Sequence, residues 1–428
     1  MGRRDPRDDR RDRHLPVARG RPDGLPRLTP SSPTTPNRKE HAVPDRPLNV
    51  LVPSVIRKDL SRRLFLSGVV GAGAAAALAA CAPSTGGGGG GAAGGGSGTL
   101  NLYTWGEYDD PAVLKSFAKT SGGASVKLGS YDSNEEMIAK LSAAKGTSGY
   151  DLVVPTLGFV PQMVELGLLE ELDHDKLPNL KNVRAEALDT EFDKGNRYSV
   201  PKAAGVTGYV YDTTVIKRDL TTWKDFFDAA QKEAAGKTSL LGDPNEILWA
   251  YFFSIGEDIN TNDSATLDEA RDWLVKNIAP HVQQFESYVS NTIAQSGRVL
   301  AHAWNGDARL GIIENDDKER YRFVKPTEGA SRFQDNWSIP KGADSVDAAH
   351  AFIDYVLKPD VSLKELEYIG YDTLTTGIED QTKSADVERP DLIFYTSEES
   401  KKLEFNIVPK SQEQRVKIFN DIQAAAGS

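Results

Sequence analysis

The sequence is poor in cysteine: Cys81 is the only one among its 428 residues. A chain with one thiol forms no disulfide within itself, so a small cross-linked scaffold is excluded. The fold must therefore rest on a hydrophobic core. The chain after Cys81 is long enough to bury one, and it exceeds the usual size of a single domain, which predicts two domains.

The sequence also lacks the common catalytic templates. It contains no H-E-x-x-H, no G-x-S-x-G and no phosphate-binding loop. A G-x-G-x-x-G pattern occurs only inside a glycine run that follows no strand and opens no helix. The histidines after Cys81 do not have the spacing of metal ligands; they are His174, His281, His302 and His350. These absences remove the familiar routes to catalysis, but they do not exclude an enzyme. We expect a protein that is not an enzyme and that holds no metal and no cofactor.

Positive charge is scarce in the body of the chain. The whole sequence has 51 basic and 62 acidic residues, a net charge of −11. Residues 1–80 hold 16 basic and 8 acidic side chains, which leaves 35 basic and 54 acidic ones, or a net charge of −19, on residues 81–428. Such a body would repel the nucleic-acid backbone and attract cations. We therefore expect no nucleic-acid partner, although an acidic surface can also serve solubility alone.

The sequence predicts an export signal. Ser61-Arg62-Arg63 precedes an apolar run over 64–80, whose 17 residues are marginal for a permanent membrane span. The paired arginines resemble the twin-arginine export signal of bacteria. Leu78-Ala79-Ala80-Cys81 resembles the lipobox, at which a lipoprotein is cut and its cysteine acylated. The alternative is a buried cysteine at the end of an ordinary helix, which would need neither the arginines nor the glycines that follow.

The segments around this signal are predicted from their composition. Residues 1–60 are rich in Arg, Asp and Pro, and we expect them to be disordered, with translation starting further along the chain. Residues 61–80 would be the signal peptide. Residues 81–98 would hold the lipidated Cys81 and a glycine-rich tether. The exported protein would then be anchored on the outer face of the cytoplasmic membrane, at the cell surface or in the periplasm.

From Thr99 the pattern alternates between strands and helices. Strands are predicted at 100–103, 125–128 and 151–155, with helices at 111–120 and 135–145 between them. This order predicts a parallel sheet covered by helices, and hence an α/β fold. A second set is predicted further on, with strands at 208–211, 239–241, 299–304, 321–324 and 338–340 and helices at 223–233, 246–255 and 264–279.

Three aromatic clusters lie beside predicted strands: 103–108, 303–307 and 333–337. The first two follow a strand, at the edge where ligands dock in open α/β sheets, and the third leads into one. Each places an aromatic ring beside a carboxylate or an amide. This pairing suits an organic ammonium, because cation–π attraction contributes ~0.5–2 kcal/mol per contact and a carboxylate fixes the charge. The alternative is that these rings only fill the core.

The run Asp243-Pro244-Asn245-Glu246 allows two interpretations. Asp at N-cap, Pro at N1 and an acid at N3 together make a stable helix start. A carboxylate at such a helix start could equally bind an amine.

In this combination the chain resembles the bacterial spermidine/putrescine-binding proteins, which feed importers powered by ATP hydrolysis. The resemblance implies a two-lobed α/β periplasmic-binding-protein fold of type II, with the ligand cleft between lobes joined by crossing strands. Lobe 1 would comprise 99–205 plus 334–379, and lobe 2 would comprise 206–333 plus 380–428, with crossovers near Gly205 and Phe333. The matching stretches are 103–108, 131–135, 150–156, 198–201, 304–306, 335–340 and 369–371.

The resemblance also implies a polyamine site. Asp335 would hold the deepest amine, and Asp243 with Glu246 would hold amines toward the other end. Three acids would serve a triamine, which favours spermidine over putrescine. An ABC import permease would be the partner of a monomeric binding protein. The remaining contacts implied are aromatic or polar, namely Trp105, Glu107, Tyr108, Thr156, Trp304, Phe333, Tyr371 and Asn406.

Three positions depart from the pattern of this family. The tyrosine expected in the loop after Thr156 is replaced by Gly158, with Phe159 next to it. A tryptophan is replaced by Phe333, and a glutamine by Asn406. These changes keep the apolar walls but lose hydrogen-bonding groups, so they leave the choice of polyamine open.

Other functions remain open at this point. Capture of a quaternary ammonium is disfavoured by the acids, whereas Arg309 and Arg332 would suit an amino-acid-like solute. A surface-tethered hydrolase could use a pair of carboxylates, as glycosidases do. A sensor or adhesion protein on the same scaffold would bind the ligand without a permease.

Overall fold

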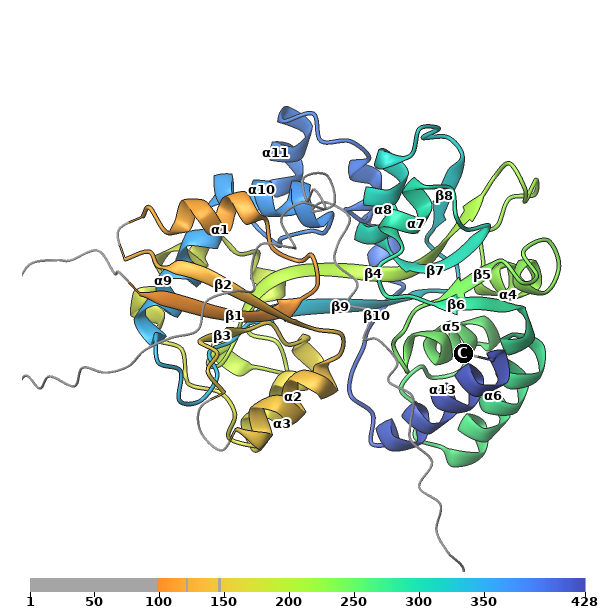
Figure 1. Ribbon diagram of the computed structural model, residues 1–428, viewed down its shortest axis with the longest axis horizontal. Helices are drawn as coiled ribbons and strands as arrows, with labels where there is room; N and C mark the ends of the chain where they lie inside the picture. Colours follow the sequence, from red (N-terminus) through yellow and green to blue (C-terminus); the bar gives the residue numbers. More distant parts are fainter. Residues whose placement is uncertain (1–97, 121, 145–147, 428) are drawn as a thin grey trace, which may run out of the picture. The chain divides into compact units, whose positions relative to one another are not determined.

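Two β-sheets organise the described chain, which comprises residues 98–120, 122–144 and 148–427 of a computed structural model (Figure 1). The predictions for residues 1–97, including those for Cys81, lie outside the described residues. The smaller sheet is parallel, in the order β2 (Ser125–Tyr131), β1 (Thr99–Trp105) and β3 (Leu152–Val153). The larger sheet is mixed, in the order β10 (Leu403–Phe405), β9 (Ala330–Trp337), β4 (Val200–Asp212), β7 (Leu300–Trp304), β5 (Thr238–Leu240) and β6 (Val282–Phe285), with β8 (Tyr321–Val324) paired to β4.

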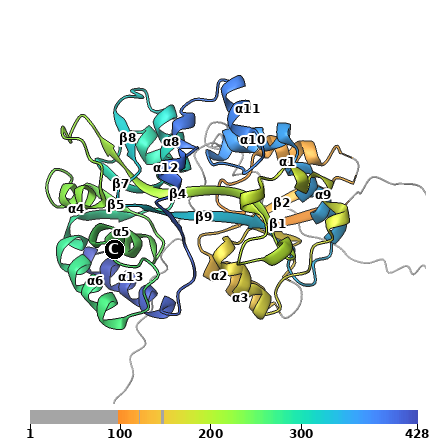
Figure 2. The same cartoon turned by 180° about the vertical axis from the view of Figure 1, so that it is seen from behind.

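Helices cover both sheets, as the alternating pattern predicts (Figures 1 and 2). None of the helices in the described residues combines the length and apolar character that a membrane span requires. The helices are α1 (Pro111–Phe117), α2 (Asn134–Ala143), α3 (Val160–Glu165), α4 (Trp223–Gln231), α5 (Glu246–Ile255), α6 (Ser264–Asn277), α7 (Ser290–Ala294), α8 (Asn305–Glu314), α9 (Val346–Val356), α10 (Pro359–Ile369), α11 (Ile378–Ser384), α12 (Ser397–Ser400) and α13 (Gln412–Ala426).

Alternation along the strands decides which helices cover which face. On β1, Leu100 and Leu102 pack with α1 and α9, whereas Tyr103 packs with α2 and α3. On β4, Tyr209 packs with α4, α5 and α6, whereas Val210 packs with α7 and α8. The central strands β1 and β4 are therefore covered by helices on both faces, which confirms the α/β prediction.

Two long strands, β4 and β9, connect the two sheets (Figure 1). They pair antiparallel over most of the length of β9, and Gly205 faces Phe333 in the register. Both strands belong to the larger sheet. Beyond this pairing, β4 continues between β7 and β8, while the chain after β9 exchanges backbone hydrogen bonds between Ser338 and Val153 of β3. The predicted crossover positions thus lie opposite each other on one strand pair. The division into two lobes stays a prediction, because the described residues form one compact unit.

The strand bounds correct two predictions. The strand predicted at 208–211 is the second half of β4, which begins at Val200. The strand predicted at 338–340 is absent as a separate element: the cluster at 333–337 is itself the end of β9, and beyond it Ser338 and Pro340 form only isolated bridges. This strand was not predicted because its buried residues include the polar Gln334, Asp335 and Asn336, which give no apolar pattern in the sequence.

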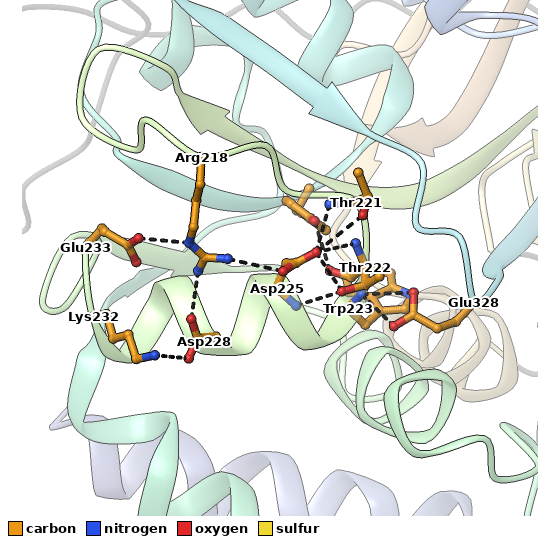
Figure 3. Close-up of polar contacts among 10 residues, drawn as sticks. Arg218, Thr221, Thr222, Trp223, Asp225, Asp228, Lys232, Glu233 and Glu328 are labelled. Atoms are coloured by element: carbon orange, nitrogen blue, oxygen red, sulfur yellow. Dashed lines mark hydrogen bonds and ion pairs between the residues drawn. The ribbon is translucent and has the colours of Figure 1, made fainter.

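The start of α4 shows how a local signal joins a helix to the core (Figure 3). The hydroxyl of Thr222 accepts a hydrogen bond from Asp225 N at 2.9 Å, and the Asp225 carboxylate accepts one from Thr222 N at 3.1 Å. This capping box satisfies two backbone N–H groups that lack helical partners. Arg218 adds ion pairs to Asp225 and Asp228 on this helix and to Glu233 just beyond its end.

The Thr222 cap predicts a measurable loss of stability. Thr222→Ala is expected to lower the free energy of unfolding by about 1–2 kcal/mol, because α4 carries fully buried aromatic side chains. Thr396 caps α12 in the same way, but α12 has four residues and buries none. Thr396→Ala should therefore cost less than about 0.5 kcal/mol, since an exposed helix end frays at little cost. Urea denaturation of both variants provides the measurement, and equal losses would contradict the argument.

Candidate binding site

One cavity of about 430 Å³ brings together all of the binding residues predicted from the sequence. It is bordered by the loop after β1, the start of α2, the starts of α5 and α8, strand β9, the end of α10 and the segment after β10. The predicted residues that line it are Trp105, Glu107, Tyr108, Thr156, Asp243, Glu246, Trp304, Phe333, Asp335, Tyr371 and Asn406. Residues separated by up to 301 positions in the sequence thus share one cavity.

Asp335 forms the first acidic contact of the cavity. It lies on β9, is 5% exposed, and its two oxygens accept hydrogen bonds from the hydroxyls of Tyr108 at 2.9 Å and Thr156 at 2.7 Å. Thr156 is oriented in turn by Asn134, whose Oδ1 accepts from Thr156 N at 3.0 Å. Burial raises the pKa of Asp335 to about 6, although both hydroxyl donors act against this shift.

Trp304 and Glu246 form the second acidic contact. The indole N–H of Trp304 donates to Glu246 Oε1 at 3.0 Å, and the hydroxyl of Ser331 donates to Oε2 at 3.3 Å. Burial, together with the smaller effect of the neighbouring Asp243 carboxylate, raises the pKa of Glu246 to about 8. Burial also raises the pKa of Asp243 to about 6. The ring of Trp304 is 6.3 Å from that of Phe333, which extends the aromatic wall along β9.

The structure corrects the helix start predicted at 243–246. The N-cap of α5 is Asn245, not Asp243, and Glu246 is the first helical residue. Asp243 Oδ1 instead accepts a hydrogen bond from Asn245 N at 2.7 Å in the preceding turn. Glu246 faces Trp304 and Ser331, so its carboxylate is used in the cavity and does not close a capping box.

The loop after β1 has a backbone that ordinary residues rarely adopt. Glu107 has φ +55°, in the left-handed region that disfavours a side chain. Before it, Gly106 N donates to the hydroxyl of Tyr288 at 3.0 Å, and a Cβ at Gly106 would lie only 3.0 Å from that oxygen. The glycine allows the loop to lie close against Tyr288 at the cavity wall, and the strained backbone of Glu107 follows directly after it.

Tyr371 contributes a further contact and reveals an acid that the sequence analysis did not assign. Its hydroxyl donates to Asp307 Oδ2, while its ring lies 5.5 Å from that of Phe333. The segments that carry Gly306 and Tyr371 approach each other closely: a Cβ at Gly306 would lie only 2.5 Å from the Tyr371 ring. Burial raises the pKa of Asp307 to about 7. Its place in the aromatic cluster 303–307 was the available signal.

Other cavity residues carried little sequence signal. Asn245 lines the cavity, is 5% exposed, and its Oδ1 has no hydrogen-bond partner among the described residues. Tyr288 is an isolated aromatic in a loop, so only the fold brings it to Gly106. Gly158 lies against Asn406: a Cβ there would be 2.8 Å from the Asn406 carbonyl oxygen. Phe159 lines the cavity next to Gly158, which stands where the resemblance expects a tyrosine.

The charge of the cavity has one sign. None of the described residues that line it is Lys, Arg or His. In the same part of the chain, no group of three His, Cys, Asp or Glu side chains is placed to hold a metal ion. Buried carboxylates that are held only by neutral donors retain a large part of their desolvation cost. An organic cation would reduce that cost. The acids that line the cavity are Glu107, Asp243, Glu246, Asp307, Glu314, Asp335 and Glu367.

Comparison with known proteins gives concordant results. A family model described as bacterial extracellular solute-binding protein matches residues 112–392. The spermidine/putrescine-binding periplasmic protein 1 of Haemophilus influenzae is 36% identical over 277 residues, which cover 64% of this chain and 75% of that protein. The putrescine/cadaverine-binding protein of Pseudomonas aeruginosa is 34% identical over 266 residues, covering 60% and 74% of the two chains.

Solved structures extend the likeness to the fold. The putative spermidine/putrescine ABC transporter from Listeria monocytogenes superposes with a TM-score of 0.69 at 30% identity, covering 76% of this chain and 99% of that chain. The Tp0655 lipoprotein of Treponema pallidum gives a TM-score of 0.65 at 27% identity, covering 77% and 99%. The predicted α/β fold of periplasmic binding proteins is thereby confirmed.

The raised pKa values predict how stability varies with pH. Glu246, Asp307 and Glu365, whose pKa burial also raises to about 8, stay protonated in the native state at pH values where the unfolded chain has lost these protons. Native protein therefore binds more protons, and stability should fall as pH rises from 6.5 to 8, by up to about 1.4 kcal/mol per pH unit for each group. His302, whose pKa burial lowers to about 3, destabilises the fold only below this window.

Urea denaturation of ligand-free protein at pH 6.5 and 8 tests this expectation. Glu246→Gln keeps an acceptor for Trp304 and a donor toward Ser331, but it cannot ionise. This variant should lose about a third to a half of the pH dependence. An unchanged pH dependence would mean that Glu246 is already ionised at neutral pH.

Proposed function

This chain belongs to the bacterial extracellular solute-binding proteins, a family that is not enzymatic, and on that premise we propose that it captures a polyamine and delivers it to an ABC import permease. The observation that carries the proposal is the cavity of acidic and aromatic side chains without a basic one among its described lining residues. A polyamine combines separated ammonium groups with flexible methylene chain. The relatives reported above carry names that include spermidine or putrescine, which supports the same ligand class.

The two acidic contacts would bind the ends of an extended ligand. An ammonium at Asp335 would meet a carboxylate already oriented by Tyr108 and Thr156, so little ordering would remain to be done on binding. Another ammonium would lie between Glu246 and Asp243. The methylene chain between them would pass Trp304 and Phe333, whose rings form the wall along β9.

This arrangement would offset the two main costs of binding. A flexible polyamine loses rotamer freedom when it is extended in a cavity, and its ammonium groups lose hydration. Charge-assisted hydrogen bonds and cation–π contacts would offset these terms, since both gain strength in a desolvated site. Closure of the predicted lobes around the ligand would then give the permease a form to distinguish from the open one.

We favour spermidine over putrescine as the ligand. The acids Asp243, Glu246 and Asp335 match three amines, and Asp307 adds a further carboxylate beside Tyr371. A diamine would leave more of these buried acids without a cation. The loss of a tyrosine hydroxyl at Gly158 reduces hydrogen bonding without reducing charge.

The competing functions are less well supported. An amino-acid-like solute would need a cation for its carboxylate, but Arg309 donates to the Glu388 carbonyl and Arg332 stacks 4.9 Å from Phe405; neither arginine lines the cavity. A glycosidase-type hydrolase does not agree with a non-enzymatic family. A sensor on the same scaffold would bind the same ligand and would differ only in its partner.

Isothermal titration of the purified protein with spermidine, putrescine, choline and glutamate tests the proposed function. Both polyamines are expected to bind, and spermidine to bind more tightly. Asp335→Asn should weaken spermidine at least tenfold, because a charge-assisted hydrogen bond of about 1.5–3 kcal/mol is lost. The matched control is Asp354→Asn, which changes a carboxylate that accepts from Asn179 and does not line the cavity. Binding of choline or glutamate without either polyamine would refute the assignment.

We also propose export through the twin-arginine route and lipid anchoring at Cys81, followed by tethered capture outside the cytoplasmic membrane. The support is the order of paired arginines, short apolar run, Leu-Ala-Ala-Cys and glycine-rich tether in the sequence. A tether of Gly and Ser would let the binding unit reach a permease beside its anchor.

Labelling with palmitate tests the anchor. Wild-type protein should incorporate the label and sediment with membranes, whereas Cys81→Ala should lose the label and enter the soluble fraction, because the remaining apolar run is short for a span. Ser84→Ala, three residues further on, is the matched control and should keep the label. Label retained in Cys81→Ala would place any lipid elsewhere.

A further inference from the structure

Lys202 is a buried lysine directly behind the cavity, and it occupies an irregular position in the strand pair. It is 5% exposed. In the register of β4 with β9, Pro201 pairs with Asn336 and Ala203 with Asp335, so two steps along β4 correspond to one step along β9. Lys202 is the extra residue of this β-bulge. Bulges of this kind redirect a side chain and are frequent beside functional sites, and this one lies opposite Asp335.

The ammonium of Lys202 is enclosed by acids and aromatic rings. Its Nζ lies 2.7 Å from Asp109 Oδ1 and 3.8 Å from Glu365 Oε2. The same atom lies 4.7 Å from the centre of the Tyr108 ring and 4.2 Å from that of Trp337. The two carboxylates and the two rings together offset the cost of burying a lysine.

These contacts tie together the segments that deliver cavity residues. Tyr108 and Asp109 are neighbours in the loop after β1, and the hydroxyl of Tyr108 donates to Asp335. Glu365 accepts from Asp110 N at 3.3 Å, which fastens the same loop to α10. Lys202 lies on β4, so its ammonium joins this strand, the loop and α10 at one point.

We propose that Lys202 is a positioning residue of the binding cavity: held by Asp109 and Glu365 against the outer face of Tyr108, it fixes the hydrogen bond between Tyr108 and Asp335 on which the deep ammonium contact depends. This inference rests on the proposed capture of an organic cation. It adds a residue that never touches the ligand.

The positive charge of Lys202 also affects the pKa of Asp335. Burial raises the pKa of Asp335 to about 6, and the positive charge of Lys202 acts in the opposite direction. The other ionisable groups around Lys202 are Asp109, Glu365 and Tyr108, from the loop after β1 and from α10. Loss of the lysine charge should therefore raise the pKa of Asp335, and the affinity for a cation should begin to fall at a higher pH than in wild type.

Lys202→Met is the first variant for the test, because it keeps the length of the side chain and removes its charge. We expect spermidine to bind about tenfold more weakly, and the pH at which binding is half lost on acidification to rise. The matched control is Lys325→Met. Lys325 also lies over an aromatic ring, 4.4 Å from that of Tyr395, and pairs with Glu399 at 3.3 Å, but it does not line or support the cavity. This control should bind like wild type.

A double-mutant cycle separates positioning from general destabilisation. If Lys202 acts through Tyr108, then in a Tyr108→Phe background the Lys202→Met change should weaken spermidine by less than about threefold. The same tenfold loss in both backgrounds would overturn the proposal, as would wild-type affinity in Lys202→Met.

Thermal unfolding checks that each variant is folded. Lys202→Met with Asp109→Asn removes both members of the ion pair and is expected to bind as weakly as Lys202→Met. Failure of both variants to fold would assign Lys202 a purely structural role and overturn the proposal.

A readout without ligand separates this inference from the proposed function. The carboxyl carbon of Asp335 can be titrated by NMR in the full chain, and its midpoint should rise in Lys202→Met. A raised midpoint in a protein that binds no polyamine would refute the proposed ligand but not the role of Lys202. Polyamine binding with an unchanged midpoint and unchanged affinity in the variant would refute the role of Lys202 alone.

Discussion

Carboxylates withdrawn from water without a cationic partner are the constraint on which this structure depends. Asp335 and Glu246 are almost fully buried and are held only by hydroxyl and indole donors. Such donors orient a carboxylate but return only part of its hydration energy. The hydration energy that is not recovered raises the pKa of each carboxyl group, so that each group keeps its proton at a pH at which it would be ionised in water. Binding of a cation would replace that proton, so recognition and protonation are linked at the same oxygens.

The antiparallel pair of β4 and β9 gives this constraint its geometry. The pair connects the two sheets, and side chains on one face of β9 project Phe333 and Asp335 into the cavity. The polar residues between and after them point the other way and form hydrogen bonds to their neighbours, as when Gln334 Nε2 donates to Asn336 Oδ1 at 3.0 Å. A strand with this alternation carries binding groups on one face and supports its own backbone on the other. Asp335 itself forms an isolated bridge with Thr156, so the acid lies close to the point where the two sheets join.

Much of the fold could be predicted from the sequence because its signals are local. Apolar alternation predicted the parallel sheet and its helices, and the strand ends pointed to the aromatic clusters at 103–108, 303–307 and 333–337. The resemblance to a family supplied the other proposed binding residues, and all eleven line one cavity. What failed depends on tertiary context. Strand β9 was hidden because buried polar residues look like a loop, and the start of β4 because Pro201 and small residues carry no strand signal. The contact of Tyr288 with Gly106 and the bulge at Lys202 could not be predicted from the sequence, because each depends on a segment that is distant along the chain. Whether the eleven residues bind a polyamine stays a prediction.

Lys202 also shows how this chain accommodates a buried primary ammonium. Its Nζ lies 2.7 Å from one carboxylate and within 4.7 Å of two aromatic ring centres, an environment that balances the loss of water with charge and ring quadrupoles together. The cavity on the other side of Tyr108 presents the same kinds of groups, with Asp335 and Glu246 beside Phe333 and Trp304, but its described lining residues include no lysine. A surrounding that stabilises an alkylammonium on one side of the Tyr108 ring is thus repeated on the other side, where the cation has to come from solution. The chemistry required of the ligand is therefore that of a lysine side chain: an ammonium on a methylene chain.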